Sequence, residues 1–183
     1  AAPRPEDVPA PAAQAAAADS SQKNLVEKNT ATRSGVYDIP WFATGTLTVG
    51  ENLTVTLTGD CGPFEDLTIA VGKNTRLTLQ NVTINGDRTL LSLAGGNTLL
   101  LAGENRLDGT GDAANNAAPT VRISGDVTVG GAGSLSVTAQ QNNAALLAAL
   151  GATVRQQSGT LSVYKSGSLS TGDGAFSAEG AAF

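Results

Sequence analysis

The sequence predicts an all-β protein: a right-handed parallel β-helix, or solenoid, of about five coils that follows an N-terminal arm. Two observations lead to this fold class. From Gly45 onward, short runs alternate Thr with aliphatic residues, which is the period-two pattern of β-strands. These runs recur at a regular 22-residue spacing, and a repeat of that length cannot bury its aliphatic side chains without stacking on its neighbours. An all-β sandwich, the alternative, does not predict a fixed recurrence.

Two sets of aliphatic residues define the repeat. The first set is Leu47 and Val49, Ile69 and Val71, Leu91 and Leu93. The second set is Val55 and Leu57, Leu77 and Leu79, Leu99 and Leu101. The turn positions Gly59, Asn81 and Gly103 keep the same spacing. Each strand is therefore expected to pair in parallel with its equivalent one coil away.

The repeat lengthens from 22 to 28 residues after the third copy. At the longer spacing, Leu99, Leu101, Gly103 and Leu107 align with Val127, Val129, Gly131 and Leu135. The extra residues are expected to form a loop at residues 112–119. A weaker copy contains Val154, Leu161 and Val163, and Leu169 begins a further fragment.

The composition divides the chain into an arm, residues 1–34, and a β-helix domain, residues 35–183. Four of the seven prolines lie between Ala1 and Ala18, a segment that is also rich in alanine. Such a segment holds too little apolar surface to stay ordered alone. We therefore expect the arm to lie against another surface, that of a neighbouring subunit.

Local propensities differ along the arm. Pro9 and Pro11 favour an extended chain, whereas residues 22–28, around Leu25 and Val26, favour a short helical segment.

Composition excludes several function classes. The chain has no His, which removes imidazole bases and ligands, and its single cysteine, Cys61, cannot form an internal disulfide. The net charge of −5 argues against nucleic acid as a partner. No apolar run reaches the length of about 18 residues that a membrane-spanning helix needs, so no membrane span is expected.

The absence of Met and the Ala-Ala-Pro start are typical of a chain from which a signal peptide has been removed. We therefore expect an exported protein, extracellular or at the cell surface. A trimmed fragment is the alternative interpretation.

Carboxylates offer the main candidates for chemistry. They are Asp60, Glu65, Asp66, Asp87, Glu104, Asp108, Asp112 and Asp126. Asp87, Glu104 and Asp108, which are expected at coil corners, each stand beside Gly, Asn or Thr, as acidic residues in solvated turns do. A calcium site is the alternative interpretation, and catalytic carboxylates are the least favoured. The sequence thus predicts a protein that is not an enzyme and has no cofactor, with calcium as the one alternative.

Aromatic residues are scarce, so each is informative. Trp41 and Phe42 stand where the arm meets the first coil and are expected to cover the open end of the core. Stacking of a sugar on Trp41 or Tyr37 is the alternative.

Two segments carry a resemblance to known proteins. Residues 77–86 (LTLQNVTING) and 95–105 (GGNTLLLAGEN) resemble β-helical surface proteins of bacteria. Many of these are described as carbohydrate-binding domain-containing proteins, and they share the pectate-lyase-like right-handed helix. The resemblance extends over residues 45–163 and leaves out the arm. It implies the fold more strongly than any function.

The ends of the β-helix suggest what the protein does. A β-helix exposes strand edges at both ends, and residues 172–183 offer no amphipathic helix to cap one of them. An uncapped end favours head-to-tail stacking of copies. We therefore expect a non-enzymatic, self-assembling structural subunit of an extracellular filament or surface layer. The alternative is a cell-surface carbohydrate-binding or adhesion module, with a polysaccharide as its partner.

The predicted assembly interface combines residues of the arm with aromatic residues near the two ends of the β-helix. These residues are Pro9, Pro11, Leu25, Val26, Trp41, Phe42, Phe176 and Phe183.

Overall fold

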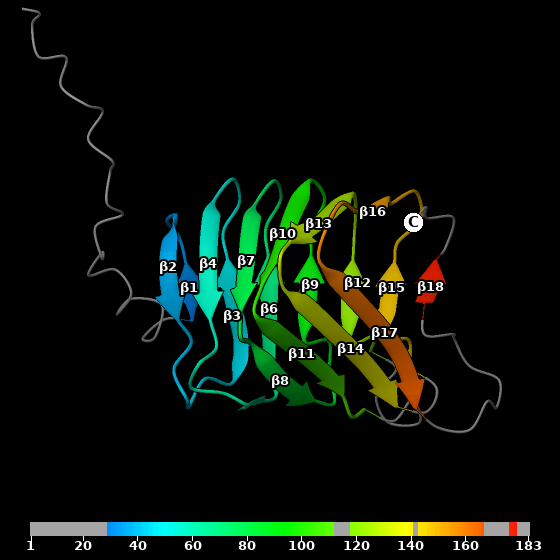
Figure 1. Cartoon of the computed structure of the whole chain (residues 1–183), viewed down its shortest axis with the longest axis horizontal. Coiled ribbons are helices and arrows are strands. Elements are labelled where there is room, and N and C mark those ends of the chain that lie inside the picture. The colour runs from blue at the N-terminus through cyan, green and yellow to red at the C-terminus, as the bar shows by residue number, and fades with distance from the viewer. Residues whose placement is uncertain (1–28, 112–117, 141–142, 167–175, 179–183) are drawn as a thin grey trace, which may run out of the picture.

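The computed structural model describes residues 29–111, 118–140, 143–166 and 176–178, and over these residues the chain forms a parallel β-solenoid of about five turns (Figure 1). This confirms the predicted all-β solenoid. Strands and turns account for the described part, which contains no helix. The short helical segment predicted around Leu25 lies outside the described residues.

Three parallel sheets form the sides of the solenoid. Sheet A consists of β1 (Thr30–Ala31), β3 (Gly45–Val49), β6 (Leu67–Val71), β9 (Leu91–Leu93), β12 (Val121–Ile123), β15 (Leu146–Ala148) and β18 (Phe176–Ala178). Sheet B consists of β2 (Gly35–Asp38), β4 (Thr54–Thr58), β7 (Arg76–Gln80), β10 (Asn97–Ala102), β13 (Val127–Gly131) and β16 (Val154–Gln156). Sheet C consists of β5 (Phe64–Glu65), β8 (Thr83–Gly86), β11 (Glu104–Gly109), β14 (Ser134–Gln140) and β17 (Thr160–Ser166).

The 22-residue register is confirmed in the middle coils. Ile69 pairs with Leu47 on one side and with Leu91 on the other, and all three side chains are buried. Because every coil repeats the same alternation, inward aliphatic side chains stack in columns and outward Thr, Asn and Ser side chains face solvent. Burial of each such aliphatic side chain stabilises the fold by about 1.5–3 kcal/mol.

The predicted register of the next coil was wrong by two residues. Leu99 pairs with Val129 rather than Val127, and Leu107 pairs with Val137 rather than Leu135. A shift of two residues leaves every side chain on the same face of a strand, so the alternation alone cannot distinguish the two alignments. Much of the extra length lies between β11 and β12, where the loop was predicted, and residues 112–117 of that loop lie outside the described part.

The corners of the solenoid use residues that tolerate positive φ. Asn81 and Gly103, predicted as equivalent turn positions, have φ values of 55° and 63°. A Cβ atom on Gly103 would lie 2.0 Å from Oδ1 of Asn81, so the Asn81 side chain packs directly on the glycine one coil above. Glycine is therefore needed at position 103 both for its conformation and for its lack of a side chain.

Two buried asparagines complete the backbone hydrogen bonding at other corners. Oδ1 of Asn105 accepts a hydrogen bond from the Val82 N–H at 3.0 Å, and its Nδ2 donates to the carbonyl oxygen of Ser134 at 3.1 Å. Asn97 repeats the first contact only, accepting from the Thr75 N–H at 2.9 Å. These amides link successive coils where the strands stop.

Candidate functional site

Large hydrophobic side chains that are exposed in the described residues gather at the two ends of the solenoid. They are Val36, Trp41, Phe42, Leu150 and Tyr164. The first three belong to the first coil, and the last two belong to the last full coil. The coils between them keep their large apolar side chains inside. The ends therefore differ in surface chemistry from the middle.

The Trp41–Phe42 pair stands on a well-anchored turn between β2 and β3. Ile39 and Ala43 are buried on either side of it, and the Ala43 N–H donates to the Pro40 carbonyl oxygen at 2.9 Å. The two rings are perpendicular with centroids 5.5 Å apart, and Trp41 is 75% exposed. The backbone is thus fixed, while both rings project from the first coil.

Tyr164 provides the exposed aromatic ring at the opposite end. It lies on β17, the last described strand of sheet C, next to the partly buried Val163. No role was predicted for Tyr164 from the sequence. Its position one residue after an inward aliphatic was the signal that it points outward.

The other predicted interface residues are only partly placed. Phe176 begins β18, whose backbone pairs with that of β15 at Leu146. Pro9, Pro11, Leu25, Val26 and Phe183 lie outside the described residues. Their proposed roles stay predictions.

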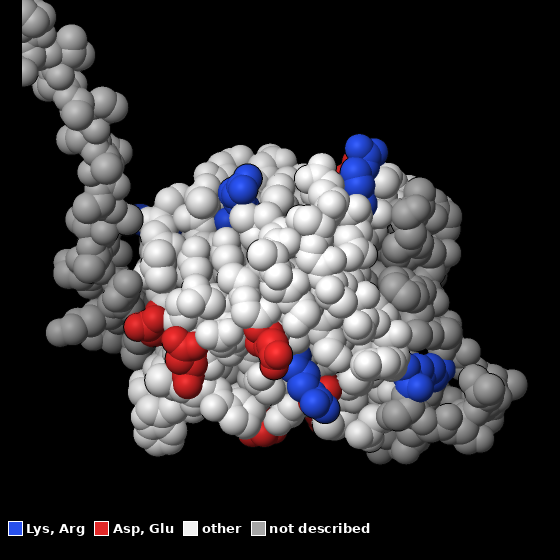
Figure 2. Space-filling model, viewed as in Figure 1, with Lys and Arg blue, Asp and Glu red and all other residues white. Residues whose placement is uncertain are grey.

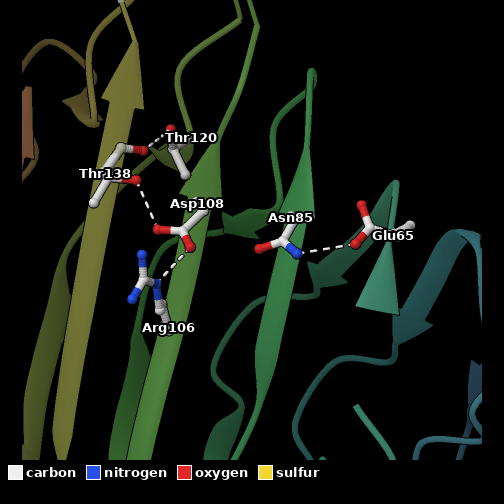
Figure 3. Close-up of polar contacts among 6 residues, drawn as sticks. All are labelled: Glu65, Asn85, Arg106, Asp108, Thr120 and Thr138. Carbon is white, nitrogen blue, oxygen red and sulfur yellow. Dashed lines mark hydrogen bonds and ion pairs between the residues drawn. The ribbon is translucent and has the colours of Figure 1, made fainter. Parts of the chain in front are cut away.

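A second candidate surface is the outer face of sheet C, where polar side chains align in register. We call the residues Glu65, Asn85, Asp108 and Thr138 the sheet C column, because each pairs with the next across adjacent strands (Figure 3). Asn85 Nδ2 donates to Glu65 at 2.9 Å, and the Thr138 hydroxyl donates to Asp108 at 2.8 Å. Arg106 also pairs with Asp108 through its Nε atom. These contacts hold the column in a fixed arrangement.

Two shallow hollows border Arg106 on this face, with volumes of about 490 and 430 Å³. The first is lined by residues such as Asn81 and Ser136, and the second by Asp108, Gln140 and Tyr164 among others. The lining mixes hydrogen-bond donors, acceptors and one aromatic ring. Such a lining suits a ligand with many hydroxyl groups.

The predicted acidic residues are dispersed and engaged in local contacts. Asp60 accepts a hydrogen bond from Asn81 Nδ2 at 2.9 Å, and Asp126 accepts from the Thr153 N–H at 2.8 Å. In the part of the chain that the structure describes, no three His, Cys, Asp or Glu side chains come close enough together to hold a metal ion. Asp112 lies outside that part. Cys61 is exposed, with a free thiol.

The face shown in Figure 2 is largely uncharged; most of the Asp and Glu side chains visible on it lie in its lower half, where one basic side chain adjoins an acidic one. Among the described residues, no helix has the length and apolar character needed to cross a membrane.

Comparisons with protein-family models, with curated proteins and with solved structures found no match for this chain. The class defined by the fold is therefore the parallel β-solenoid, and the link to bacterial carbohydrate-binding surface proteins stays a resemblance.

Proposed function

We propose that the protein is a non-enzymatic structural subunit that is exported and assembles with copies of itself into an extracellular filament or surface layer. The observation that carries this proposal is the gathering of exposed hydrophobic side chains at both ends of the solenoid. Exposed aromatic groups beside open strand edges are typical of surfaces that bind a partner.

The sheet geometry supports head-to-tail stacking. In sheet B, for example, β2 and β16 each have a neighbour on one side only among the described strands. All strands in a sheet run in the same direction, so a second copy placed on the solenoid axis can continue the sheet in parallel. Such a contact joins two different surfaces and does not close, which gives a polymer.

The N-terminal arm is proposed to strengthen this contact by reaching a neighbouring copy. Pro9 and Pro11 lower the entropy cost of ordering an extended segment, and Leu25 and Val26 supply apolar surface. Removal of residues 1–20 should then leave a folded β-rich monomer.

Analytical ultracentrifugation over a range of concentrations, combined with electron microscopy, tests the proposal. The full chain should form species many times the mass of one copy, with filaments or sheets in the micrographs. A full chain that stays monomeric at every concentration would show that self-assembly is not its function.

The second candidate function is a cell-surface carbohydrate-binding or adhesion module. The mixed polar lining around Arg106 and Tyr164 favours it. Arg106→Ala should abolish retention on immobilised polysaccharides, whereas Arg122→Ala, which removes an exposed arginine from β12 on sheet A, should leave it unchanged. Equal retention by both variants and the wild type would locate any binding elsewhere.

A further inference from the structure

We infer that successive copies meet on the sheet C side of the solenoid, where Tyr164 of one copy packs against the Trp41–Phe42 pair of the next. This inference rests on the proposed self-assembly and specifies the contact that assembly would use. It follows from the way the three sheets begin and end.

The described part of the chain enters the solenoid in sheet A with β1 and continues in sheet B with β2. It then returns to sheet A with β3, and sheet C begins only one coil later, with β5. The turn that carries Trp41 and Phe42 therefore occupies the side of the first coil where each later coil has a sheet C strand. The aromatic pair stands on the sheet C side of this end.

The opposite end is also stepped, and again sheet A extends farthest. Sheet C ends at β17, whereas sheet A continues by one more strand, β18 (Figure 1). The three sheets accordingly have seven, six and five strands in the described part. At this end of the described solenoid, sheet A therefore projects one strand beyond the last strands of sheets B and C.

Two such solenoids can approach each other end to end only until their sheet A strands meet, because sheet A extends farthest at both described ends. If β18 of one copy continues into β1 of the next, the described strands make sheet A continuous and leave sheet B one strand short and sheet C two strands short. Two strand spacings correspond to a gap of about 9–10 Å on the sheet C side. A gap of that width at an apolar core must be filled by large side chains or by water.

The exposed aromatic residues stand at this gap. Tyr164 is 57% exposed and pairs with Thr138, so it continues the sheet C column on the outer face of the last described strand, at the edge of this gap. Trp41 and Phe42 approach from the other side, as a perpendicular pair 5.5 Å between centroids. Aromatic side chains each bury about 150–250 Å² and pack well edge to face, which matches them to a gap between two backbones.

A head-to-head contact would use the same surface differently. Two first coils facing each other would bring Trp41 against the partner copy's own Trp41 and would leave Tyr164 exposed. Only the head-to-tail arrangement brings Tyr164 and Trp41 together. The two arrangements are therefore distinguished by which residues become neighbours.

Cross-linking of mixed copies tests the arrangement. In a Cys61→Ser background, one protein carries Trp41→Cys and another carries Tyr164→Cys, and the two are mixed with a bis-maleimide that spans about 10 Å, the width of the gap. Dimers should form in the mixture and not with either protein alone. A mixture of Arg122→Cys with Tyr164→Cys, which pairs a mid-solenoid position with the end, should give none.

The outcomes separate this inference from the proposed function. Wild-type assembly without cross-links in the mixture would overturn the sheet C contact and leave self-assembly standing. Cross-links with Trp41→Cys alone would establish the head-to-head contact instead. A wild-type chain that never assembles would overturn both.

Sedimentation of alanine variants covers the case in which the cysteine variants no longer assemble. Trp41→Ala and Tyr164→Ala should each weaken association by about tenfold or more, and the double variant by less than the product of the two effects. The control Arg122→Ala should change association by less than about twofold. Fully multiplicative losses would show that the two residues do not touch across the contact.

Discussion

The middle coils and the end coils of this solenoid are built from the same alternating strands but differ in surface. Between β3 and β9, each strand of sheet A pairs with the strand one regular repeat later. The offset departs from this repeat elsewhere in the sheet. It is shorter at the first pair, where Thr30 pairs with Thr48. It is longer both at the last pair, β15 with β18, and in the middle, where Leu91 pairs with Val121. A middle coil must fit neighbours on both sides, whereas an end coil fits one. A loop can absorb extra residues at a middle coil as well as at an end. Among the described residues, the exposed aromatic side chains are confined to the end coils.

The largest expected effect concerns the middle. Leu79→Asp places a carboxylate in the fully buried column that Leu79 shares with Leu57 and Leu101. An unpaired charge there should cost several kcal/mol, a large part of the roughly 5–15 kcal/mol that stabilises a typical domain. Thermal melts followed by circular dichroism should show loss of the folded state. Thr78→Asp, one residue earlier and outward, should melt within a few degrees of the wild type; similar damage from both changes would contradict the register.

A smaller loss is expected at the corners, where two glycines provide a matched pair. Gly103→Ala combines an unfavourable positive φ with the contact to Asn81 and should destabilise by about 2–4 kcal/mol. Gly45 has φ 77° and no atom within 4 Å of an added Cβ, so Gly45→Ala should cost only about 1–2 kcal/mol. Urea denaturation measures both. Equal losses would mean that the Asn81 side chain moves aside freely.

The sheet C column should respond to charge. Asn85 lies between Glu65 and Asp108, so Asn85→Asp aligns three carboxylates on adjacent strands and should cost about 1–2 kcal/mol at neutral pH. Neighbouring negative charge raises the pKa of the new carboxyl in the folded state, so the deficit should be full above about pH 6 and should disappear below about pH 3, where that carboxyl is protonated in both states. Denaturation at several pH values measures this dependence.

The control for this change lies on the same strand. Thr83 is also outward but pairs with Arg106, so Thr83→Asp should be nearly neutral. Calcium should restore the stability of Asn85→Asp if the three carboxylates can share the ion. A deficit that does not depend on pH would show that the lost amide hydrogen bond, rather than charge, is responsible.

Much of the fold could be predicted because stacking makes each coil repeat the pattern of the last. Leu57 and Leu79 can be aligned from the sequence, since an inward position must stay apolar in every coil. The pairing of Val127 with the buried Asn97 could not be aligned from the sequence, because Asn97 is a polar residue in an apolar column. Its burial is explained only by the structure, in which the Asn97 side-chain oxygen accepts a hydrogen bond from the Thr75 N–H. Alternation leaves such two-residue shifts undecided.

The candidate surfaces were less predictable than the fold. Trp41 and Phe42 drew attention because aromatic residues are rare in this chain. Tyr164 did not, although its place one residue after the inward Val163 puts it on the outer face of β17. The alignment of Asn85 with Asp108 depends on an offset slightly longer than the regular repeat. The exact offset between strands decides which outward residues become neighbours. The inward pattern stays apolar for several offsets, so it does not reveal which one is used.

The smallest expected effect on stability belongs to Trp41. Because 75% of this residue is exposed in the first coil, Trp41→Ala should change the free energy of unfolding of the dilute monomer by less than about 0.5 kcal/mol. Phe64→Ala, which empties a buried position on β5, should cost about 3–5 kcal/mol in the same urea titration. A loss of several kcal/mol with Trp41→Ala would show that Trp41 packs against a part of its own chain beyond the described residues. The aromatic pair would then serve the stability of one copy, and the contact between copies would have to be sought elsewhere.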